Sequence, residues 1–204
     1  MRGHQFTFSL TMHFFLFLYS GVNHIAHHFL TRALLPYVTP WGRVVTVTAQ
    51  AHNKVQNFAL DDLNYNARRY SSYAAYCQSK LSNILFSKAL QDKLNAASSS
   101  NNNIISLSIH PGLVLTNMWR QCGDLVVGSI SDFISCKTPE QGASTNVFCC
   151  LAKEGFVTPG EYFVDCKSSI ASSIASDKIH RNKLWEVTEL MIREAGFSLP
   201  EKIH

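Results

Sequence analysis

A tyrosine and a lysine four positions apart, Tyr76 and Lys80, are the residues of this sequence best suited to chemistry. On a helix this spacing puts both side chains on one face, one turn from each other. A free phenol, with a pKa of about 10, transfers protons poorly at neutral pH. Because a neighbouring ammonium favours the phenolate, it lowers that pKa toward the working range. The pair therefore predicts a proton-transfer site, and a solvated helix face is the alternative.

The segments around this pair predict the framework that must position it. Residues 42–49 and 103–109 form nearly continuous β-branched and apolar runs, as expected of parallel strands buried on both faces. Residues 71–94 between them carry leucine and isoleucine at helical spacing, so the three segments predict a βαβ unit. Ligands of such sheets lie beyond the carboxyl ends of the strands, where Ala49 and a Pro-Gly pair fall.

The same periodicity predicts further helices, at residues 22–36, 139–152 and 178–195. Thr138 is expected to cap the helix that begins at Pro139, with Gln141 completing a capping box. The serine-rich stretch 168–176 predicts a surface loop. The expected fold class is α/β, a Rossmann-type parallel sheet with flanking helices.

From about residue 21 to the C-terminus the chain carries short motifs in a fixed order. They are VNHIAHHFL (22–30), RVV (43–45), AYCQSKLSNILF (75–86), HPGLVLT (110–116), KTPEQGA (137–143), EYFVDCK (161–167) and LWEV (184–187). In this order they resemble the short-chain dehydrogenase/reductase family, in particular its retinol-dehydrogenase and WW-domain-oxidoreductase branch. The resemblance implies an NAD(P)-dependent oxidoreductase that acts on a lipophilic alcohol or carbonyl, retinoid-like or steroid-like.

The resemblance also implies roles for individual residues. In the family, a tyrosine in the position of Tyr76 exchanges a proton with the substrate oxygen. A lysine in the position of Lys80 lowers the tyrosine pKa and holds the nicotinamide ribose, and an asparagine in the position of Asn23 keeps a water that relays the proton. The residues that match the family's cofactor-binding pieces are Tyr76, Lys80, Pro111, Gly112, Val114 and Thr116.

The segment between Asn117 and Lys137 would, by the same resemblance, cover a lipophilic substrate. Its large apolar residues are Met118, Trp119, Leu125, Val126, Val127 and Phe133. An ordinary hydrophobic core is the alternative interpretation of these residues.

The sequence departs from the family's pattern at the end of the first strand. The family's second serine there, which hydrogen-bonds the reacting carbonyl, aligns with Ala49, which has no hydroxyl. The neighbouring Thr48 has one, but adjacent strand residues point to opposite faces, so it could substitute only if the strand has already ended. Loss of one such donor costs roughly 2.7–4 kcal/mol of barrier. We therefore expect impaired activity.

A second departure concerns the nucleotide-binding half. A strand and a glycine-rich turn that seats the pyrophosphate should precede Asn23, but Gly3 and Gly21 are the only glycines before Gly42. The first acidic residue is Asp61, so no upstream acid is present to bind a ribose hydroxyl. The expected organisation is a C-terminal portion of the family's domain at residues 21–204. Binding of NAD or NADP by this chain alone is accordingly doubtful.

The first 20 residues do not resemble the family. Residues 6–19 are mostly apolar, which suggests either a targeting segment or membrane tether or an unrelated extension. If the chain were secreted, only the C-terminal half of a nucleotide-binding fold would be exported. We therefore expect an intracellular protein, either cytoplasmic or associated with the endoplasmic reticulum.

Charge and cysteine spacing exclude other classes of function. The net charge of +4 is spread without a Lys/Arg block, so no nucleic-acid partner is expected. The six cysteines show no C-x-x-C pair. Three histidines, His24, His27 and His28, share a helical face without a carboxylate or thiol nearby, so no metal is expected.

A non-catalytic protein that acts through association is the alternative to an enzyme. In many family members the helices that match residues 22–36 and 71–94 form the dimer interface. A homo-oligomer through these helices is therefore the expected assembly in either case.

Overall fold

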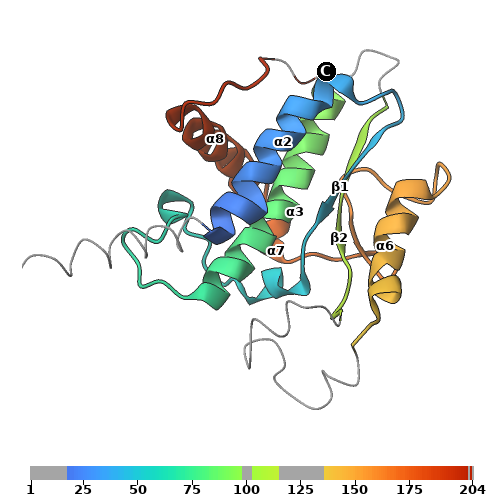
Figure 1. Cartoon of the computed structure of the whole chain (residues 1–204), viewed down its shortest axis with the longest axis horizontal. Helices are drawn as coiled ribbons and strands as arrows, with labels where there is room; N and C mark the ends of the chain where they lie inside the picture. The colour runs from blue at the N-terminus through green and yellow to red at the C-terminus, as the bar shows by residue number, and fades with distance from the viewer. Residues whose placement is uncertain (1–17, 98–102, 115–135, 202, 204) are drawn as a thin grey trace, which may run out of the picture.

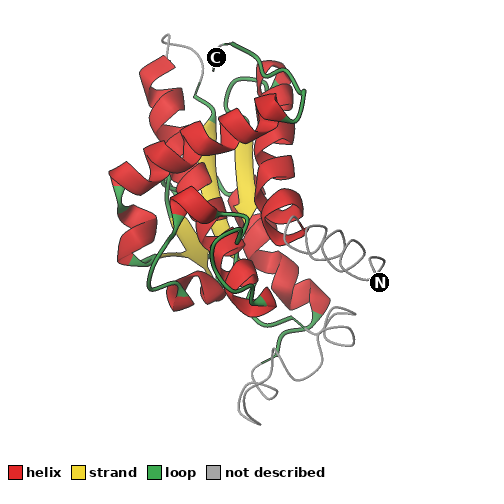
Figure 2. Cartoon of the chain, turned by 90° about the vertical axis from the view of Figure 1, so that its left-hand side faces the viewer, coloured by secondary structure: helices red, strands yellow, loops and turns green. Residues whose placement is uncertain are grey.

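The computed structural model describes residues 18–97, 103–114, 136–201 and 203. Its sheet has the order β1-β2-β3-β4, with bounds Arg43–Val47, Ile105–His110, Tyr162–Val164 and Lys167–Ser169. Helix α3 (Ser72–Ala97) lies on one face, with α2 (Ala26–Leu34) and α8 (Lys178–Glu194) packed around it, and α6 (Pro139–Leu151) lies on the other face (Figure 1). Figure 2 shows the helices of the α3 face in front of the strands.

The predicted βαβ unit is confirmed. Strands β1 and β2 pair in parallel, with Arg43 opposite Ile105 and Val47 opposite Ile109, and α3 connects them. Strand β3 continues the parallel sheet, with Ser108 opposite Tyr162. This mostly parallel sheet between helical layers is the expected α/β fold class.

The first predicted helix divides into three parts. Residues Leu18–Ile25 form the π-helix η1, Ala26–Leu34 the α-helix α2, and Leu35–Tyr37 a 3₁₀ turn, η2. A wide π turn cannot be told from an α turn by apolar spacing alone, so the sequence predicted one continuous helix. The capping box of α6 is present as predicted, because Thr138 accepts from the backbone of Gln141 and the Gln141 side chain accepts from that of Thr138.

The prediction of a surface loop at 168–176 is right about the surface, because all of these residues except Ala175 are exposed or half-buried, but wrong about the loop. Strand β4 pairs antiparallel with β3, and Ser172 caps the short helix α7 (Ser173–Ser176). The hairpin turn consists of Asp165 and Cys166, whose φ angles are 50° and 59°. Hairpin turns of this kind are normally signalled by Asn-Gly, and that signal is missing here.

The core forms two layers, one on each face of the sheet. On the α3 face, Leu81, Ile84 and Leu85 are fully buried and cluster with residues of β3 and α8. On the α6 face, Leu107 and Ile109 pack with residues of α6 and β3. Each such side chain contributes roughly 1.5–3 kcal/mol on burial. The layer on the α3 face packs this helix against the sheet.

Strand β1 is one of the two edges of the described sheet. Its only partner among the described strands is β2, and its Val47 is 42% exposed. By contrast, five of the six residues of β2 are buried. Strand β1 has apolar side chains on both faces, and its neighbours in the described structure leave part of this apolar surface exposed.

Candidate active site

Helix α3 brings Tyr76 and Lys80 together as the spacing predicts. The Lys80 ammonium lies 5.6 Å from the centre of the Tyr76 ring, and both side chains are half-buried. Burial lowers the pKa of Lys80 below its ordinary value. No carboxylate among the described residues forms an ion pair with this ammonium. A half-buried cation without a counter-charge is suited to hold an oxygen ligand or a phenolate.

The π-helix η1 supplies the neighbours of Tyr76. The Tyr19 ring meets the Tyr76 ring edge to face, with 6.0 Å between their centres. One turn later, Asn23 donates from Nδ2 to the hydroxyl of Ser79 at 3.1 Å, and that hydroxyl donates to the carbonyl of Tyr76 at 2.8 Å. Asn23 thus lies beside the turn of α3 that separates Tyr76 from Lys80.

The backbone beyond β1 stays extended. Thr48 donates from its backbone N–H to the carbonyl of Ile109, and Ala49 has φ −150° and ψ 154°. The Thr48 hydroxyl donates to the backbone carbonyl of Lys80 at 2.6 Å. Strand β1 itself ends at Val47, so Thr48 lies just beyond it. The bond to the Lys80 carbonyl occupies the proton with which the Thr48 hydroxyl could replace the missing serine.

The turn after β2 forms the second wall of this edge of the sheet. Gly112 has a φ of 91°, and an added Cβ there would lie 2.8 Å from the side chain of Lys137. The Lys137 ammonium donates to the carbonyl of Pro111 at 3.2 Å and forms an ion pair with Asp165. Val114 forms an isolated parallel bridge with Lys137. Thus Pro111, Gly112 and Val114 are held together at the carboxyl end of β2, whereas Thr116 lies outside the described residues.

Sequence reasoning missed two features of this edge. Lys137 was assigned no role, although it belongs to the KTPEQGA motif and it pairs with the hairpin residue Asp165. Two buried histidines, His52 and His110, also lie here, and burial together with the Lys137 charge lowers the pKa of His110 to about 4. Neither the Lys137–Asp165 pair nor the burial of the two histidines had a signal in the sequence, because both depend on contacts between segments far apart in the chain.

The predicted substrate cover, residues 117–137, falls largely outside the described residues, and so do residues 6–17. No helix of the described part is long and apolar enough to cross a membrane. The described residues also contain no group of three His, Cys, Asp or Glu that could hold a metal. Of the three histidines on the first helix, His24 and His28 are buried and His27 is exposed.

Comparison with known proteins relates this geometry to one family. The chain is 33% identical to human retinol dehydrogenase 14 over 178 residues, which are 84% of this chain and 51% of that protein. It is 34% identical to human retinol dehydrogenase 12 over 172 residues, 82% and 52% of the two chains. It is 35% identical to short-chain dehydrogenase TIC 32 A, chloroplastic, of Brassica napus over 176 residues, 81% and 54%. No protein-family model matches the sequence.

A solved structure shows the same fold. The crystal structure of an uncharacterized protein from Mycobacterium Paratuberculosis matches with a TM-score of 0.64 and 28% identity, over 88% of this chain and 59% of that one. The chain thus spans about half the length of the curated relatives it matches. On this homology the chain is a distant member of the short-chain dehydrogenase/reductase family, related to the retinol dehydrogenases.

Proposed function

We propose that this chain carries the proton-transfer half of an NAD(P)-dependent oxidoreductase for a lipophilic alcohol or carbonyl, retinoid-like or steroid-like. The single observation that carries the proposal is the Tyr76–Lys80 pair, with the ammonium 5.6 Å from the ring centre and no carboxylate partner in the described structure. Its relatives named retinol dehydrogenases support the substrate class.

The described residues fit the nicotinamide end of the cofactor. The Lys80 ammonium, which has no carboxylate partner among the described residues, would hold the ribose hydroxyls, and the Pro111-Gly112 turn would lie against the carboxamide. The described part carries no G-x-G-x-x-G run to seat a pyrophosphate. When bound, the nicotinamide would supply the hydride acceptor or donor. Cofactor affinity should therefore depend on contacts that the described residues do not make.

The residues of the chain itself would move the proton. The Tyr76 phenol would exchange a proton with the substrate oxygen, and the Lys80 charge would stabilise the phenolate. Asn23, fixed to Ser79, would hold the water that carries the proton onward. With alanine at position 49, the developing oxyanion would lack one donor, which costs roughly 2.7–4 kcal/mol of barrier. The expected enzyme is slow.

The test is turnover of retinol and of a steroid alcohol with NAD and NADP, followed by nicotinamide absorbance. It should use the chain itself and a fusion in which the nucleotide-binding half of a relative replaces the residues before Gly21. Tyr76→Phe and Lys80→Met should abolish turnover. Tyr73→Phe, an exposed tyrosine on the same helix, is the matched control. Turnover that survives Tyr76→Phe would refute the proposal.

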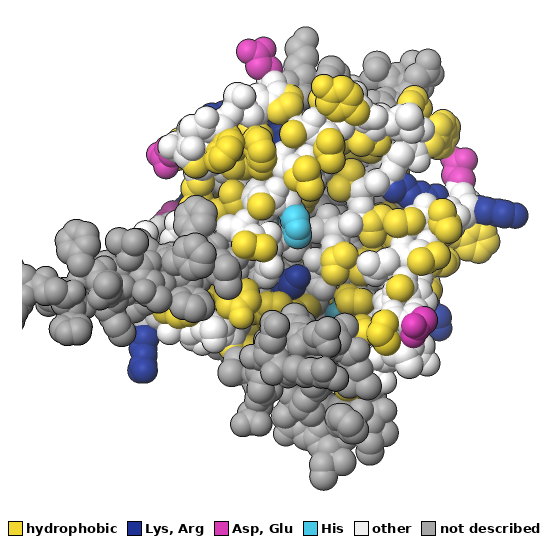
Figure 3. Space-filling view, viewed as in Figure 1, with side chains coloured by type: hydrophobic (Ala, Val, Ile, Leu, Met, Phe, Trp, Pro, Cys, Tyr) yellow, Lys and Arg dark blue, Asp and Glu magenta, His cyan; other side chains and the backbone are white. Residues whose placement is uncertain are grey.

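Association through α2 is the second candidate function. Val22, Leu30 and Leu34 are exposed apolar side chains along η1 and α2, and apolar or uncharged side chains cover much of this face of the molecule (Figure 3). Helix α3 contributes little, because the chain itself buries or half-buries its residues from Ala75 to Gln91. The predicted two-helix interface thus reduces to one exposed helix.

Sedimentation of the chain tests this candidate. A Leu30→Glu, Leu34→Glu double variant should shift an oligomer to monomer, because like charges would face each other across the apolar contact. Leu190→Glu, equally exposed but on α8, is the matched control. An unchanged distribution in the double variant would exclude α2 as the interface.

A further inference from the structure

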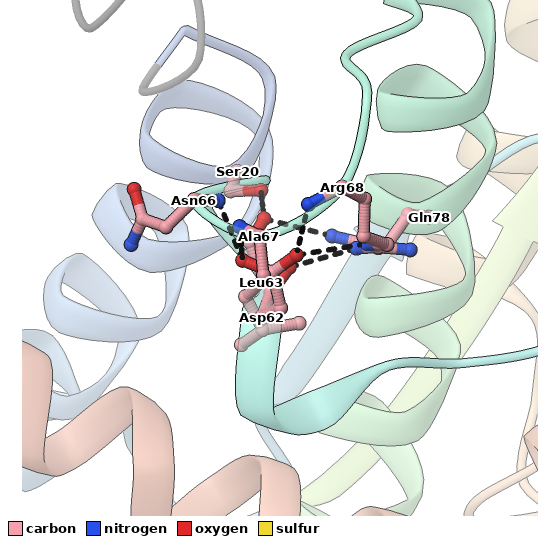
Figure 4. Close-up of polar contacts among 7 residues, drawn as sticks. All are labelled: Ser20, Asp62, Leu63, Asn66, Ala67, Arg68 and Gln78. Carbon is pink, nitrogen blue, oxygen red and sulfur yellow. Dashed lines mark hydrogen bonds and ion pairs between the residues drawn. The ribbon is translucent and has the colours of Figure 1, made fainter.

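A polar network joins the loop before α3 to the helix itself (Figure 4). The Asp62 carboxylate accepts hydrogen bonds from the backbone N–H groups of Asn66, Ala67 and Arg68, and from the Arg68 side chain at 3.1 Å. Burial would raise the pKa of Asp62, but the hydrogen bonds from Ala67, Asn66 and Arg68 outweigh it and lower the pKa. The loop is therefore closed around a carboxylate that stays charged.

Arg68 connects the closed loop to helix α3. From Nη2 it donates to the carbonyl of Asp62 at 2.7 Å and to the Oε1 atom of Gln78 at 2.8 Å. Its guanidinium also stacks 4.0 Å from the ring centre of Tyr65. A planar guanidinium can make these contacts at once, whereas the point charge of a lysine cannot.

The carbonyl of Leu63 joins the same loop to both helices of the candidate active site. It accepts from Gln78 Nε2 at 2.9 Å and from the Ser20 hydroxyl at 3.3 Å. Ser20 is three residues before Asn23 on η1, and Gln78 lies midway between Tyr76 and Lys80 on α3. One loop carbonyl is thus bonded to both elements that carry the proposed proton-transfer residues.

Gln78 is placed to set the rotation of α3 about its own axis. A residue two positions away on a helix points roughly to the opposite side, about 200° round. Gln78 therefore faces away from Tyr76 and Lys80, and both ends of its amide are bonded, one to Arg68 and one to Leu63. Only 3% of its surface is exposed, so a missing partner would leave a buried amide group unsatisfied.

We propose that Gln78, held by the Asp62–Arg68 loop, is a positioning residue that fixes the orientation of Tyr76 and Lys80 relative to Asn23. This inference rests on the proposed function of that pair. If Gln78 loses its bonds, the first turns of α3, which carry Tyr76, can distort relative to the turn that carries Lys80, and the ammonium then no longer keeps its distance from the phenol ring.

The experiment follows the ionisation of Tyr76 in the complete 204-residue chain, labelled with ¹³Cζ-tyrosine and titrated by NMR. The chain has seven tyrosines, so the Tyr76 signal is assigned as the one that Tyr76→Phe removes. Lys80→Met should raise the titration midpoint of Tyr76 by about one pH unit, because it removes the neighbouring charge. Gln78→Met should raise it by about half a pH unit through geometry alone, since neither residue is charged.

A second glutamine on the same helix is the matched control. Gln91 is 5% exposed and donates to Asn95, and its Oε1 atom accepts from the backbone of Ser106. Gln91→Met also removes buried hydrogen bonds, but far from Tyr76, so it should leave the Tyr76 midpoint unchanged. If Gln78→Met does not fold, Arg68→Lys keeps the charge while losing the planar fork, and should shift the midpoint in the same direction.

The outcomes separate the two proposals. Positioning by Gln78 is supported if the Tyr76 midpoint shifts in Lys80→Met and in Gln78→Met but not in Gln91→Met. Where Gln78→Met does not fold, a shift in Arg68→Lys takes its place. A shift in Lys80→Met alone would overturn the positioning role and leave the proposed function standing. No shift in Lys80→Met would overturn both, because the charge would then not act on the phenol. Equal shifts in Gln78→Met and Gln91→Met would reduce Gln78 to a general stabiliser of α3.

Discussion

The hydroxyl of Thr48 donates to the backbone carbonyl of Lys80 at 2.6 Å. This bond joins the end of β1 to the helical turn that carries the proposed catalytic lysine. It also commits the proton of the hydroxyl nearest to Ala49, so this hydroxyl cannot donate to a substrate oxygen while the bond lasts. The residue after β1 thus helps to hold Lys80, and we predict that it does not supply the donor that Ala49 lacks.

Ala49→Ser should therefore raise turnover. The new hydroxyl would point to the face opposite Thr48 and supply the missing donor, and a gain of about tenfold or more is expected from the cost of one oxyanion donor. The measurement is turnover of a retinoid or steroid alcohol by the fusion protein described above. Ala51→Ser, two residues further on, is the control. Equal rates for Ala49→Ser and the parent would mean that a water already supplies the donor.

The buried histidines make the fold sensitive to acid. Burial lowers the pKa of His24 to about 3, whereas the unfolded chain protonates histidine at about 6.5. Between these values the unfolded state binds more protons, so the free energy of unfolding falls as the pH decreases below 6.5. The expected slope is about 1.4 kcal/mol per pH unit for each such histidine.

Urea denaturation at pH 7, 6 and 5 measures this slope. His24→Gln should reduce this slope by the amount that one titrating histidine contributes, about 1.4 kcal/mol per pH unit. The variant also loses the contact between His24 and Thr188, so it should be less stable at pH 7. His27→Gln, on the exposed side of the same helix, should keep the parent slope. Parallel slopes in all three proteins would show that His24 is not the titrating group.

Arg43 should contribute more to the stability of the fold than an ordinary surface arginine. It donates from Nη1 to the carbonyl of Cys149 at 2.7 Å and from Nη2 to that of Ala152, at the C-terminal end of α6. A cation is favourable at this end of a helix. Arg43→Met should cost about 1.5–3 kcal/mol of stability by chemical denaturation. The exposed Arg69→Met should stay within about 0.5 kcal/mol, and a similar small loss in Arg43→Met would contradict the capping role.

The side of β1 that has no partner strand in the described part of the chain should promote aggregation. Unpaired backbone groups on an apolar edge strand are a template for another chain, and an edge lysine blocks such pairing. Val47→Lys should therefore increase the soluble fraction after expression and decrease binding of an amyloid dye. Val147→Lys, on α6 and similarly exposed, adds the same charge away from the edge. If both variants improve solubility equally, net charge and not the edge is responsible.

The parts of the fold that repeat locally could be predicted from the sequence. The run from Arg43 to Val47 and the leucine spacing of α3 show what each segment buries, so the βαβ unit followed directly. The start of α6 was also predictable, because a capping box is a contact between residues three apart. Tyr76 and Lys80 lie within one turn of one helix, which is why their proximity could be predicted.

Contacts between distant segments could not be predicted in this way. The bond between Gln78 and Leu63, and the ion pair between Lys137 and Asp165, depend on the path that loops take in three dimensions, which periodicity does not give. The hairpin at Asp165 was missed for another reason. Its backbone takes a left-handed conformation that glycine and asparagine normally signal, and the sequence places neither there.

In that hairpin the same two positions determine both the stability of the turn and the charge beside Lys137. Left-handed backbone costs roughly 1–2 kcal/mol for most residues with a side chain, and Asn and Asp partly avoid this cost, so an Asn-Gly turn in place of Asp165-Cys166 would fold more favourably mainly because glycine replaces Cys166. The exchange would remove the carboxylate that pairs with Lys137, and the ammonium beside Pro111 would then be left without its neutralising charge. A hairpin engineered for heat resistance would therefore give this edge of the sheet a different electrostatic potential.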